Sequence, residues 1–428
     1  MYHLENTVRD YAWGDTDLIA SLLGRAPSGG PEAEMWIGAH PGAPSRLRGA
    51  DGAQHDGAPR LDEFIAADPA ARLGEEAGAR FGRLPFLAKV LAAAAPLSLQ
   101  VHPTLEQARA GFAAQQAAGL DPAAPESNYK DDNHKPEMLL ALTELTALCG
   151  FREPRVSSAL FGRLAASQGL SEPARGAAER IRALLDGGDL AGAFTALLGG
   201  RERDVPPPIR DLVDQAPGAV ALLQPGPPDL DPGLAELESL AGHYPGDPGV
   251  LISLLLNHVT LRPGQAIALP AGNVHAYLRG LGIEVMASSD NVLRGGLTPK
   301  HVDVAELLAT VDFRPLPVPY VEPVETEFGQ RVYRPGFDEF ELQVLDVRPG
   351  ADVPVGQRGP AVVLVTAGAL VLDSPTGDVM VDRGESVFLP ATAAPVVARL
   401  AQSARTGFGD DDGGSATAFA VTLPPPAG

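Results

Sequence analysis

The sequence predicts a mainly β fold that is interrupted by an α-helical insertion and followed by a second β domain. Two observations support this. Short apolar or alternating runs bounded by Gly and Pro, which are typical of strands, fill residues 1–152 and return from residue 249. Between them, residues 153–248 are rich in Ala and Leu at helical spacing. A chain of 428 residues is also too long for one ordinary core, so we expect more than one domain.

Individual elements follow from local patterns. The stretch LSLQVH (97–102) alternates apolar and polar residues and predicts a strand. Residues 104–119 predict a helix with Thr104 as its N-cap, and residues 300–311 predict a second helix. The Pro-rich residues 313–328 predict a linker to a last β domain, 329–428. The first domain is therefore expected to be discontinuous, formed by residues 1–152 and 249–312.

An internal similarity links the two β regions. Residues 264–277 (GQAIALPAGNVHAY) align without a gap to residues 384–397 (GESVFLPATAAPVV). His275 of the first copy corresponds to Pro395 of the second. The alignment predicts two similar β units, of which only the first keeps a potential metal ligand.

The amino-acid composition limits the kinds of molecule that the protein is expected to bind. A net charge of −21 argues against nucleic acid or an anionic membrane as a partner, although a small anionic substrate can still bind where positive charge is local. The single cysteine, Cys149, excludes a disulfide framework and a thiolate-rich metal site. No apolar run approaches the length of a membrane span, and the first residues contain no signal-like apolar segment, so we expect a cytoplasmic protein.

Several polar residues are candidates for a metal site. Gln100 and His102 lie two apart on the predicted strand, so their side chains share one face. His275 follows Pro270 and Gly272 at a spacing that resembles the second metal motif of the cupins, small jelly-roll barrels that hold a divalent metal. Arg279 stands where that motif has an Asn, and Gln100 stands where the first cupin motif has a His.

Four longer motifs narrow the resemblance from the cupins in general to one family. EMWIGAHPGAPS, LPFLAKVLAAAAPLSLQVHP, NHKPEM and LPAGNVHAYLRGLGIEVMASSDNVLRGGLTPKHVDV occur in the order found in the type I mannose-6-phosphate isomerases, which the chain resembles from residue 11 to its end. The resemblance implies a cupin catalytic domain, a helical insertion and a metal-free C-terminal jelly roll. It also implies the interconversion of mannose 6-phosphate and fructose 6-phosphate through a cis-enediol. One zinc ion per chain would be bound by Gln100, His102, Glu137 and His275.

The resemblance also implies roles for other residues. Arg294 matches the catalytic arginine of the family, and Ser98 and Lys300 match positions near the substrate. The remaining matches line the pocket: Lys89, His134, Lys135, Tyr277, Glu284 and Asp290. The resemblance does not decide which residue transfers the proton, with His134 or Lys135 together with Asp290 as the first choice and Lys89 as the second.

Lysines are scarce in this sequence, since only four of the 33 Lys and Arg residues are Lys, and three of these four fall in the pocket motifs.

Two other functions remain open from the sequence. One is a different metal-dependent cupin enzyme such as an oxygenase, against which the Gln ligand and the missing His-x-His cluster count. The other is a non-catalytic or differently specialised metal-binding cupin that acts on or binds another sugar phosphate. We expect a monomer or a weak homo-oligomer.

Overall fold

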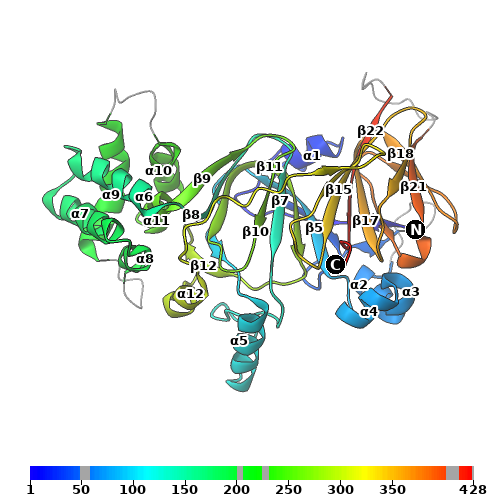
Figure 1. Ribbon diagram of the computed structural model, residues 1–428, viewed down its shortest axis with the longest axis horizontal. Coiled ribbons are helices and arrows are strands. Elements are labelled where there is room, and N and C mark those ends of the chain that lie inside the picture. Colours follow the sequence, from blue (N-terminus) through cyan, green and yellow to red (C-terminus); the bar gives the residue numbers. More distant parts are fainter. Residues whose placement is uncertain (49–57, 200–205, 224–230, 402–413, 427–428) are drawn as a thin grey trace.

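The protein consists of a middle β region with a helical layer on one side and a second β region on the other (Figure 1). The structure is a computed structural model and describes residues 1–48, 58–199, 206–223, 231–401 and 414–426. The predicted mainly β fold with an α-helical insertion is confirmed. The division into domains at the predicted boundaries stays a prediction.

The middle region is one ten-stranded antiparallel sheet folded around the long strand β11 (His275–Ala287). The C-terminal half of β11 pairs with β5 and β7, and its N-terminal half pairs with β6 and β8. The pairing order has free ends, so the sheet is folded over but does not close into a ring. Its other strands are β2 (Thr7–Arg9), β3 (Glu34–Gly38), β5 (Phe86–Ala93), β6 (Leu99–Val101), β7 (Glu137–Ala141), β8 (Leu145–Phe151), β9 (Leu256–Leu261), β10 (Ala266–Leu269) and β12 (Leu293–Gly296).

Alternation along these strands decides which side chains face inward. On β5, Leu91 and Ala93 belong to the apolar cluster inside the folded sheet, while Ala88 and Val90 pack outward against the second β region. Side chains alternate with a period of two along a strand, so Lys89 shares the inward face of Leu91. The same alternation on β7 puts Glu137 on the inward face of Leu139.

The second β region has an eight-stranded and a four-stranded sheet with an apolar core between them. Two strands from the N-terminal part of the chain, β1 and β4, extend the larger sheet, which contributes Phe388 and Phe419 to the core shared with the middle region. The larger sheet contains β13 (Val324–Glu325), β14 (Arg331–Tyr333), β15 (Glu341–Val347), β22 (Ala416–Thr422), β17 (Ala361–Ala367), β20 (Ser386–Leu389), β1 (Tyr2–Glu5) and β4 (Arg46–Leu47). The smaller sheet contains β16 (Asp352–Val355), β21 (Val396–Leu400), β18 (Ala369–Asp373) and β19 (Val379–Asp382).

The internal similarity corresponds to the same local structure in both regions. Strands β10 and β20 each begin two residues after a glycine, Gly264 and Gly384, whose φ angles are 88° and 87°. Because L-residues rarely adopt this conformation, both turns favour Gly. One strand lies in the middle region and its counterpart in the second.

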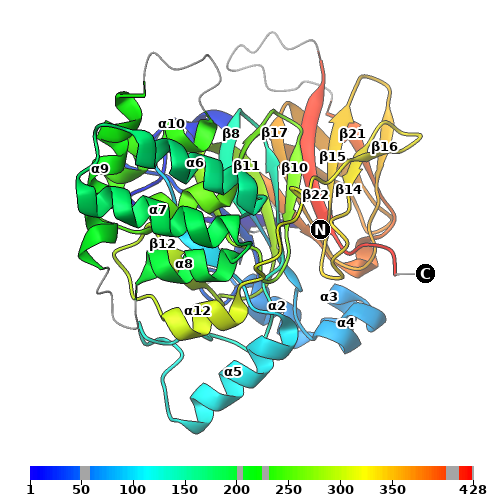
Figure 2. The same cartoon turned by 60° about the vertical axis from the view of Figure 1, so that its left-hand side comes forward.

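The helices fill the insertion and the edges. Helices α6 to α10 form the layer that covers one side of the middle sheet (Figure 2). The helices are α1 (Leu18–Leu22), α2 (Leu61–Ala67), α3 (Pro69–Leu73), α4 (Glu75–Phe81), α5 (Leu105–Ala117), α6 (Pro154–Ala166), α7 (Glu172–Asp186), α8 (Leu190–Leu198), α9 (Pro207–Ala221), α10 (Pro232–His243), α11 (Gly249–Ile252) and α12 (Val304–Thr310), with 3₁₀ turns at Ser253–Leu255 and Ala391–Ala393. Among these, none has the length and apolarity needed to cross a membrane.

Two of the predicted helices can be compared directly with helices of the structure. Helix α5 confirms the prediction for 104–119, and Thr104 and Gln107 form a capping box at its start. Helix α12 begins at Val304, four residues later than predicted. Asp303 caps it by accepting a hydrogen bond from the Glu306 N–H (3.1 Å), so Lys300 lies in the preceding turn.

An ion pair joins the helical insertion to the middle sheet. Arg279 of β11 donates to both carboxylate oxygens of Glu236 on α10 (3.0 and 2.9 Å), and His258 of β9 lies 3.6 Å from the same carboxylate. The contacts with His258 and then with Arg279 outweigh burial and lower the pKa of Glu236 to about 2. Arg279, which replaces the Asn of the cupin motif, therefore has a structural contact.

We expect Glu236→Gln to lower the Tm at pH 7 by about 2 °C, because it removes the charge from this contact. A carboxylate with a depressed pKa stabilises the fold fully above its unfolded pKa of about 4.5, and this stabilisation is lost as the pH falls towards 2. The Tm difference between the two proteins should therefore shrink as the pH is lowered below 4.5. Thermal unfolding from pH 7 to pH 3 measures this. A difference that stays constant over that range would contradict the assigned pKa.

Candidate active site

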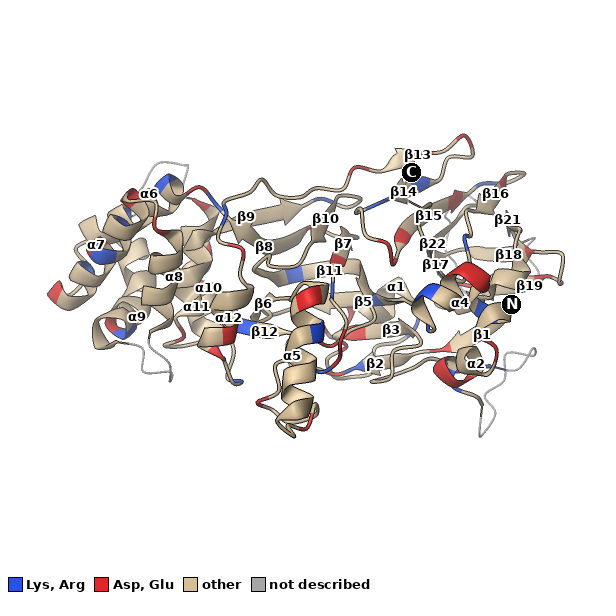
Figure 3. Cartoon of the chain, turned by 60° about the horizontal axis from the view of Figure 1, so that its bottom comes forward, with Lys and Arg blue, Asp and Glu red and all other residues tan. Residues whose placement is uncertain are grey.

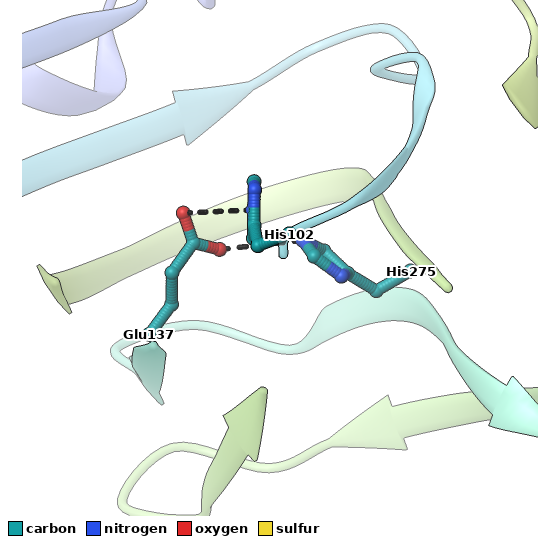
Figure 4. A group of neighbouring side chains, drawn as sticks. All are labelled: His102, Glu137 and His275. Carbon is teal, nitrogen blue, oxygen red and sulfur yellow. Dashed lines mark ion pairs between the residues drawn. The ribbon is translucent and has the colours of Figure 1, made fainter. Parts of the chain in front are cut away.

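Three of the predicted metal ligands meet inside the folded sheet. The Glu137 carboxylate lies 3.4 Å from Nε2 of His102 and 3.3 Å from Nε2 of His275 (Figure 4). The donor atoms of the three residues all lie within 4.8 Å of one another, and all three side chains are buried. His102 directly follows β6, while Glu137 and His275 are the first residues of β7 and β11. The site is therefore built where three strands begin or end.

Backbone carbonyls fix both imidazoles. His102 donates from Nδ1 to the carbonyl of Asn291 (2.7 Å), and His275 donates from Nδ1 to the carbonyl of Asn273 (3.0 Å). A neutral imidazole that carries its proton on Nδ1 has a lone pair on Nε2, which is the nitrogen that faces Glu137 in both residues. Both rings thus have the tautomer that a metal ligand requires.

The strand register places Gln100 on the same inward face of the sheet as the cluster. It is the direct cross-strand partner of His275 on β11 and of Arg294 on β12. Directly paired residues of antiparallel strands project to the same side of the sheet. Leu99 and Val101 pack outward against the helical layer, which leaves Gln100 on the inward side.

The donor set fits a divalent metal. Nε2 of His102 is buried and has no hydrogen-bond partner in the described part of the chain, a costly arrangement unless a cation occupies the site. Burial lowers the pKa of His102 to about 4, so this imidazole is neutral at pH 7 and its Nε2 lone pair is available. Cys149 is the cross-strand partner of His275, but burial raises its pKa to about 12, and its thiol is not part of the cluster. Nitrogen and oxygen ligands without thiolate are typical of catalytic zinc sites.

Buried lysines and carboxylates surround the cluster. Lys89 lies 2.8 Å from Glu284 and 3.4 Å from Glu34, and Lys135 lies 2.9 Å from Glu137. Three carboxylates therefore face two ammonium groups, and the excess of one negative charge in a buried region is expensive unless a cation balances it. Charged positions also lie along the strands of the middle sheet in the overall view (Figure 3).

These neighbours shift the ionisation of the buried groups. Burial disfavours the charged form of Lys89, but Glu284, Glu34 and Glu137 outweigh it and raise the pKa of Lys89. Burial raises the pKa of Glu284 even though Lys89 opposes that shift. Despite its burial, Lys135 and His102 hold the pKa of Glu137 well below its ordinary range. Glu137 is therefore ionised and Lys89 is charged at neutral pH.

A second group of cations lies beside Gln100. Arg294 is half-buried, and no hydrogen bond or ion pair of its side chain occurs within the described ranges. Burial and then the charge of Arg294 lower the pKa of Lys300 and of Lys130, so the charge of Arg294 acts on both lysines. Lys300 lines a cavity of about 230 Å³ together with Thr298 and Asp247, at the junction with the helical insertion. Ser98 is half-buried immediately before β6.

The remaining predicted residues have separate surroundings. His134 donates from Nε2 to Glu339 (2.7 Å), a residue of the second β region. Asp290 is half-exposed and lies 3.6 Å from Nε2 of the buried His40. Tyr277 is buried in the inner apolar cluster, where burial and the charges of Glu284 and Glu137 raise the pKa of its hydroxyl.

Sequence reasoning missed three contributors. Glu34 is the second carboxylate at Lys89, and it also accepts a hydrogen bond from the Trp36 indole (2.8 Å). Asn291 is fully buried, supplies the carbonyl for His102 and donates to the Asn133 carbonyl (2.8 Å). Glu339 reaches His134 from more than 200 residues away. Glu34 and Asn291 lie within the quoted motifs, and the available signal was a polar residue at the start of the apolar strand β3 for Glu34 and an amide between β11 and β12 for Asn291.

The folded sheet and its buried His–Glu–His cluster are those of a cupin-type protein with a candidate metal site. Comparisons with known proteins agree. Residues 1–154 match the family model of the type I phosphomannose isomerase catalytic domain. The chain is 38% identical over 409 residues to the mannose-6-phosphate isomerase of Salmonella typhimurium, covering 92% of this chain and 96% of that protein. It is 32% identical over 402 residues to a probable mannose-6-phosphate isomerase of Caenorhabditis elegans, covering 91% and 90%.

Solved structures give the same result. A lysine-to-alanine variant of the Salmonella typhimurium phosphomannose isomerase superposes with a TM-score of 0.83 at 35% identity, covering 99% of each chain. A mannose 6-phosphate isomerase bound with zinc and yttrium superposes with a TM-score of 0.82 at 34% identity, covering 99% of this chain and all of that one. The chain belongs to the type I phosphomannose isomerase family.

Proposed function

We propose that this protein interconverts mannose 6-phosphate and fructose 6-phosphate and that it uses one zinc ion per chain. The observation that carries the proposal is the buried cluster of His102, Glu137 and His275 in a member of this family. The zinc-bound relative supports zinc as the metal. Gln100 is the proposed fourth ligand, because its strand register puts it opposite His275. A bound divalent ion would act as a Lewis acid that polarises the substrate oxygens during the reaction.

The isomerisation requires ring opening and then transfer of a proton between C2 and C1 through a cis-enediol. Negative charge develops on the substrate oxygens during this transfer, so fixed cations stabilise it. We assign Arg294 to this role, because its half-buried guanidinium has no protein counter-ion within the described ranges. Lys89 is held in its charged form by three carboxylates, which favours electrostatic stabilisation over a role as general base.

His134 is our choice for the proton carrier, with Lys135 and Asp290 as the alternatives. A histidine takes up and releases protons near neutral pH. Lys135 instead pairs with Glu137, which favours a role in holding that ligand. Asp290 faces His40, whose Nδ1 accepts a hydrogen bond from the Gly42 N–H (3.2 Å) and whose Nε2 therefore carries the proton when the ring is neutral.

The phosphate of the substrate needs local positive charge in a protein with a net charge of −21. Lys300, which lines the cavity next to Arg294, is our proposed anchor, with Ser98 as a further contact. Glu284 and Tyr277 are proposed to contact the sugar hydroxyls or to orient Lys89.

We expect the purified protein to convert mannose 6-phosphate to fructose 6-phosphate in an enzyme-coupled assay, to act weakly or not at all on glucose 6-phosphate, and to be equally active without oxygen. Turnover of mannose 6-phosphate with loss of activity under anaerobic conditions would support an oxygen-dependent enzyme instead. Binding of the sugar phosphate without any turnover would overturn the proposed function and favour a non-catalytic sugar-phosphate-binding protein.

A further inference from the structure

Glu339 belongs to the second β region but contacts a residue of the metal-site motif. It lies two residues before β15, and its Oε1 accepts a hydrogen bond from Nε2 of His134 (2.7 Å). His134 stands three residues before Glu137 and next to Lys135, which contacts Glu137. The second β region therefore reaches the segment that supplies a metal ligand.

The surroundings of Glu339 hold it in place. The preceding residue, Asp338, pairs with Arg80 of α4 at the surface. The following residue, Phe340, is fully buried in the core shared by the two β regions and packs edge-on against Phe337. Strand β15 contributes Leu342 and Val344 to the same core as residues of β5 and β7. The residues on both sides of Glu339 are therefore anchored, Asp338 by an ion pair and Phe340 by burial in the core.

The hydrogen bonding of Glu339 is incomplete for a purely structural residue. The residue is only 7% exposed, and its second oxygen, Oε2, is buried without a hydrogen-bond partner among the residues that the structure describes. A buried carboxylate oxygen without a donor costs stability, and folded proteins retain such groups mainly where function requires them. Replacing both His134 and Glu339 by apolar residues would remove this cost.

We propose that Glu339 is a positioning residue of the active site. By accepting a hydrogen bond from the Nε2–H group, it fixes the orientation and the tautomer of His134, which leaves Nδ1 as the nitrogen that can take up a proton. The second β region, which was predicted only as a metal-free jelly roll, thereby completes the catalytic centre. This inference rests on the proposed isomerase function with His134 as the proton carrier.

Steady-state kinetics of Glu339→Gln, His134→Asn and the double variant test the proposal. Glutamine keeps the shape of Glu339 but removes its charge. We expect kcat to fall by about 10- to 100-fold, with KM changed by less than about threefold and the metal content unchanged. In the His134→Asn background, Glu339→Gln should cause little further loss. Glu339→Asp should retain more activity than Glu339→Gln, and it replaces that variant in the test if Glu339→Gln does not fold.

Asp346→Asn is the matched control, because it removes a carboxylate of β15 that pairs with Arg331 away from His134, and it should leave kcat unchanged. A wild-type kcat in Glu339→Gln would overturn the proposal. The same loss with and without His134 would also overturn it, since Glu339 would then act through another group. If the wild-type protein shows no turnover of mannose 6-phosphate, the proposed function fails first, which distinguishes the two failures.

Discussion

His275→Ala is expected to purify without its zinc and to lose isomerase activity by at least about a thousandfold. His275 supplies one of the two imidazole nitrogens of the buried cluster. Alanine at this position removes that nitrogen from beside the Glu137 carboxylate. Loss of a metal that stabilises developing negative charge removes several kcal/mol of transition-state stabilisation, and about 4 kcal/mol corresponds to a thousandfold in rate. Metal analysis by mass spectrometry together with the coupled assay measures both effects.

His243→Ala is the matched control for this experiment. His243 is exposed at the end of α10, where it hydrogen-bonds to the Ser239 carbonyl of its own helix and lies beside the Tyr244 ring, so its removal should change neither zinc content nor rate. Full zinc occupancy in His275→Ala would show that the metal binds elsewhere. Loss of zinc with normal activity would show that the metal has no part in the reaction.

Arg294→Ala is expected to lower kcat by about 100- to 1,000-fold while the zinc stays bound. Arg294 lies opposite Gln100 on the inward face, and a bulge between Arg294 and Gly296 distorts β12 at this point, as bulges near active sites often do. Removal of one fixed donor to a developing oxyanion typically costs this much. Arg294→Lys should recover only part of the rate, since an ammonium group lacks the planar fork of the guanidinium.

Kinetics and metal analysis on the same preparation separate this role from a structural one. Arg399→Ala, which removes an exposed arginine from the smaller sheet of the second β region, should behave like the wild type. A near-normal kcat in Arg294→Ala would exclude the assigned role. Loss of zinc would instead indicate that Arg294 acts by holding Gln100.

The set of metal ligands, Glu137 included, was predicted from the family resemblance, and local patterns supported three of the four. Gln100 lies on β6 and His102 directly follows that strand, while His275 follows a Gly- and Pro-containing turn, so each short segment limits the direction of its side chain. The scarcity of lysine was also informative, since Lys89 and Lys135 are buried next to carboxylates of the site. The mainly β fold and the capped helix α5 followed from the same kind of local pattern.

Contacts between distant segments could not be predicted. Glu339 meets His134 only because β15 packs against the middle sheet, and no local pattern near residue 339 indicates that packing. Strands β1 and β4 extend the larger sheet of the second β region although they come from the first 47 residues. The late start of α12 had a different cause, because the side chain of Asp303 competed successfully as the cap.

Titration of zinc into the metal-free protein, with the conversion of mannose 6-phosphate followed at each step, tests the central claim most directly. The account predicts no activity after chelation and a linear recovery that stops at one zinc ion per chain, while His275→Ala recovers none. Full activity in the metal-free protein, or recovery that continues beyond one equivalent, would contradict it.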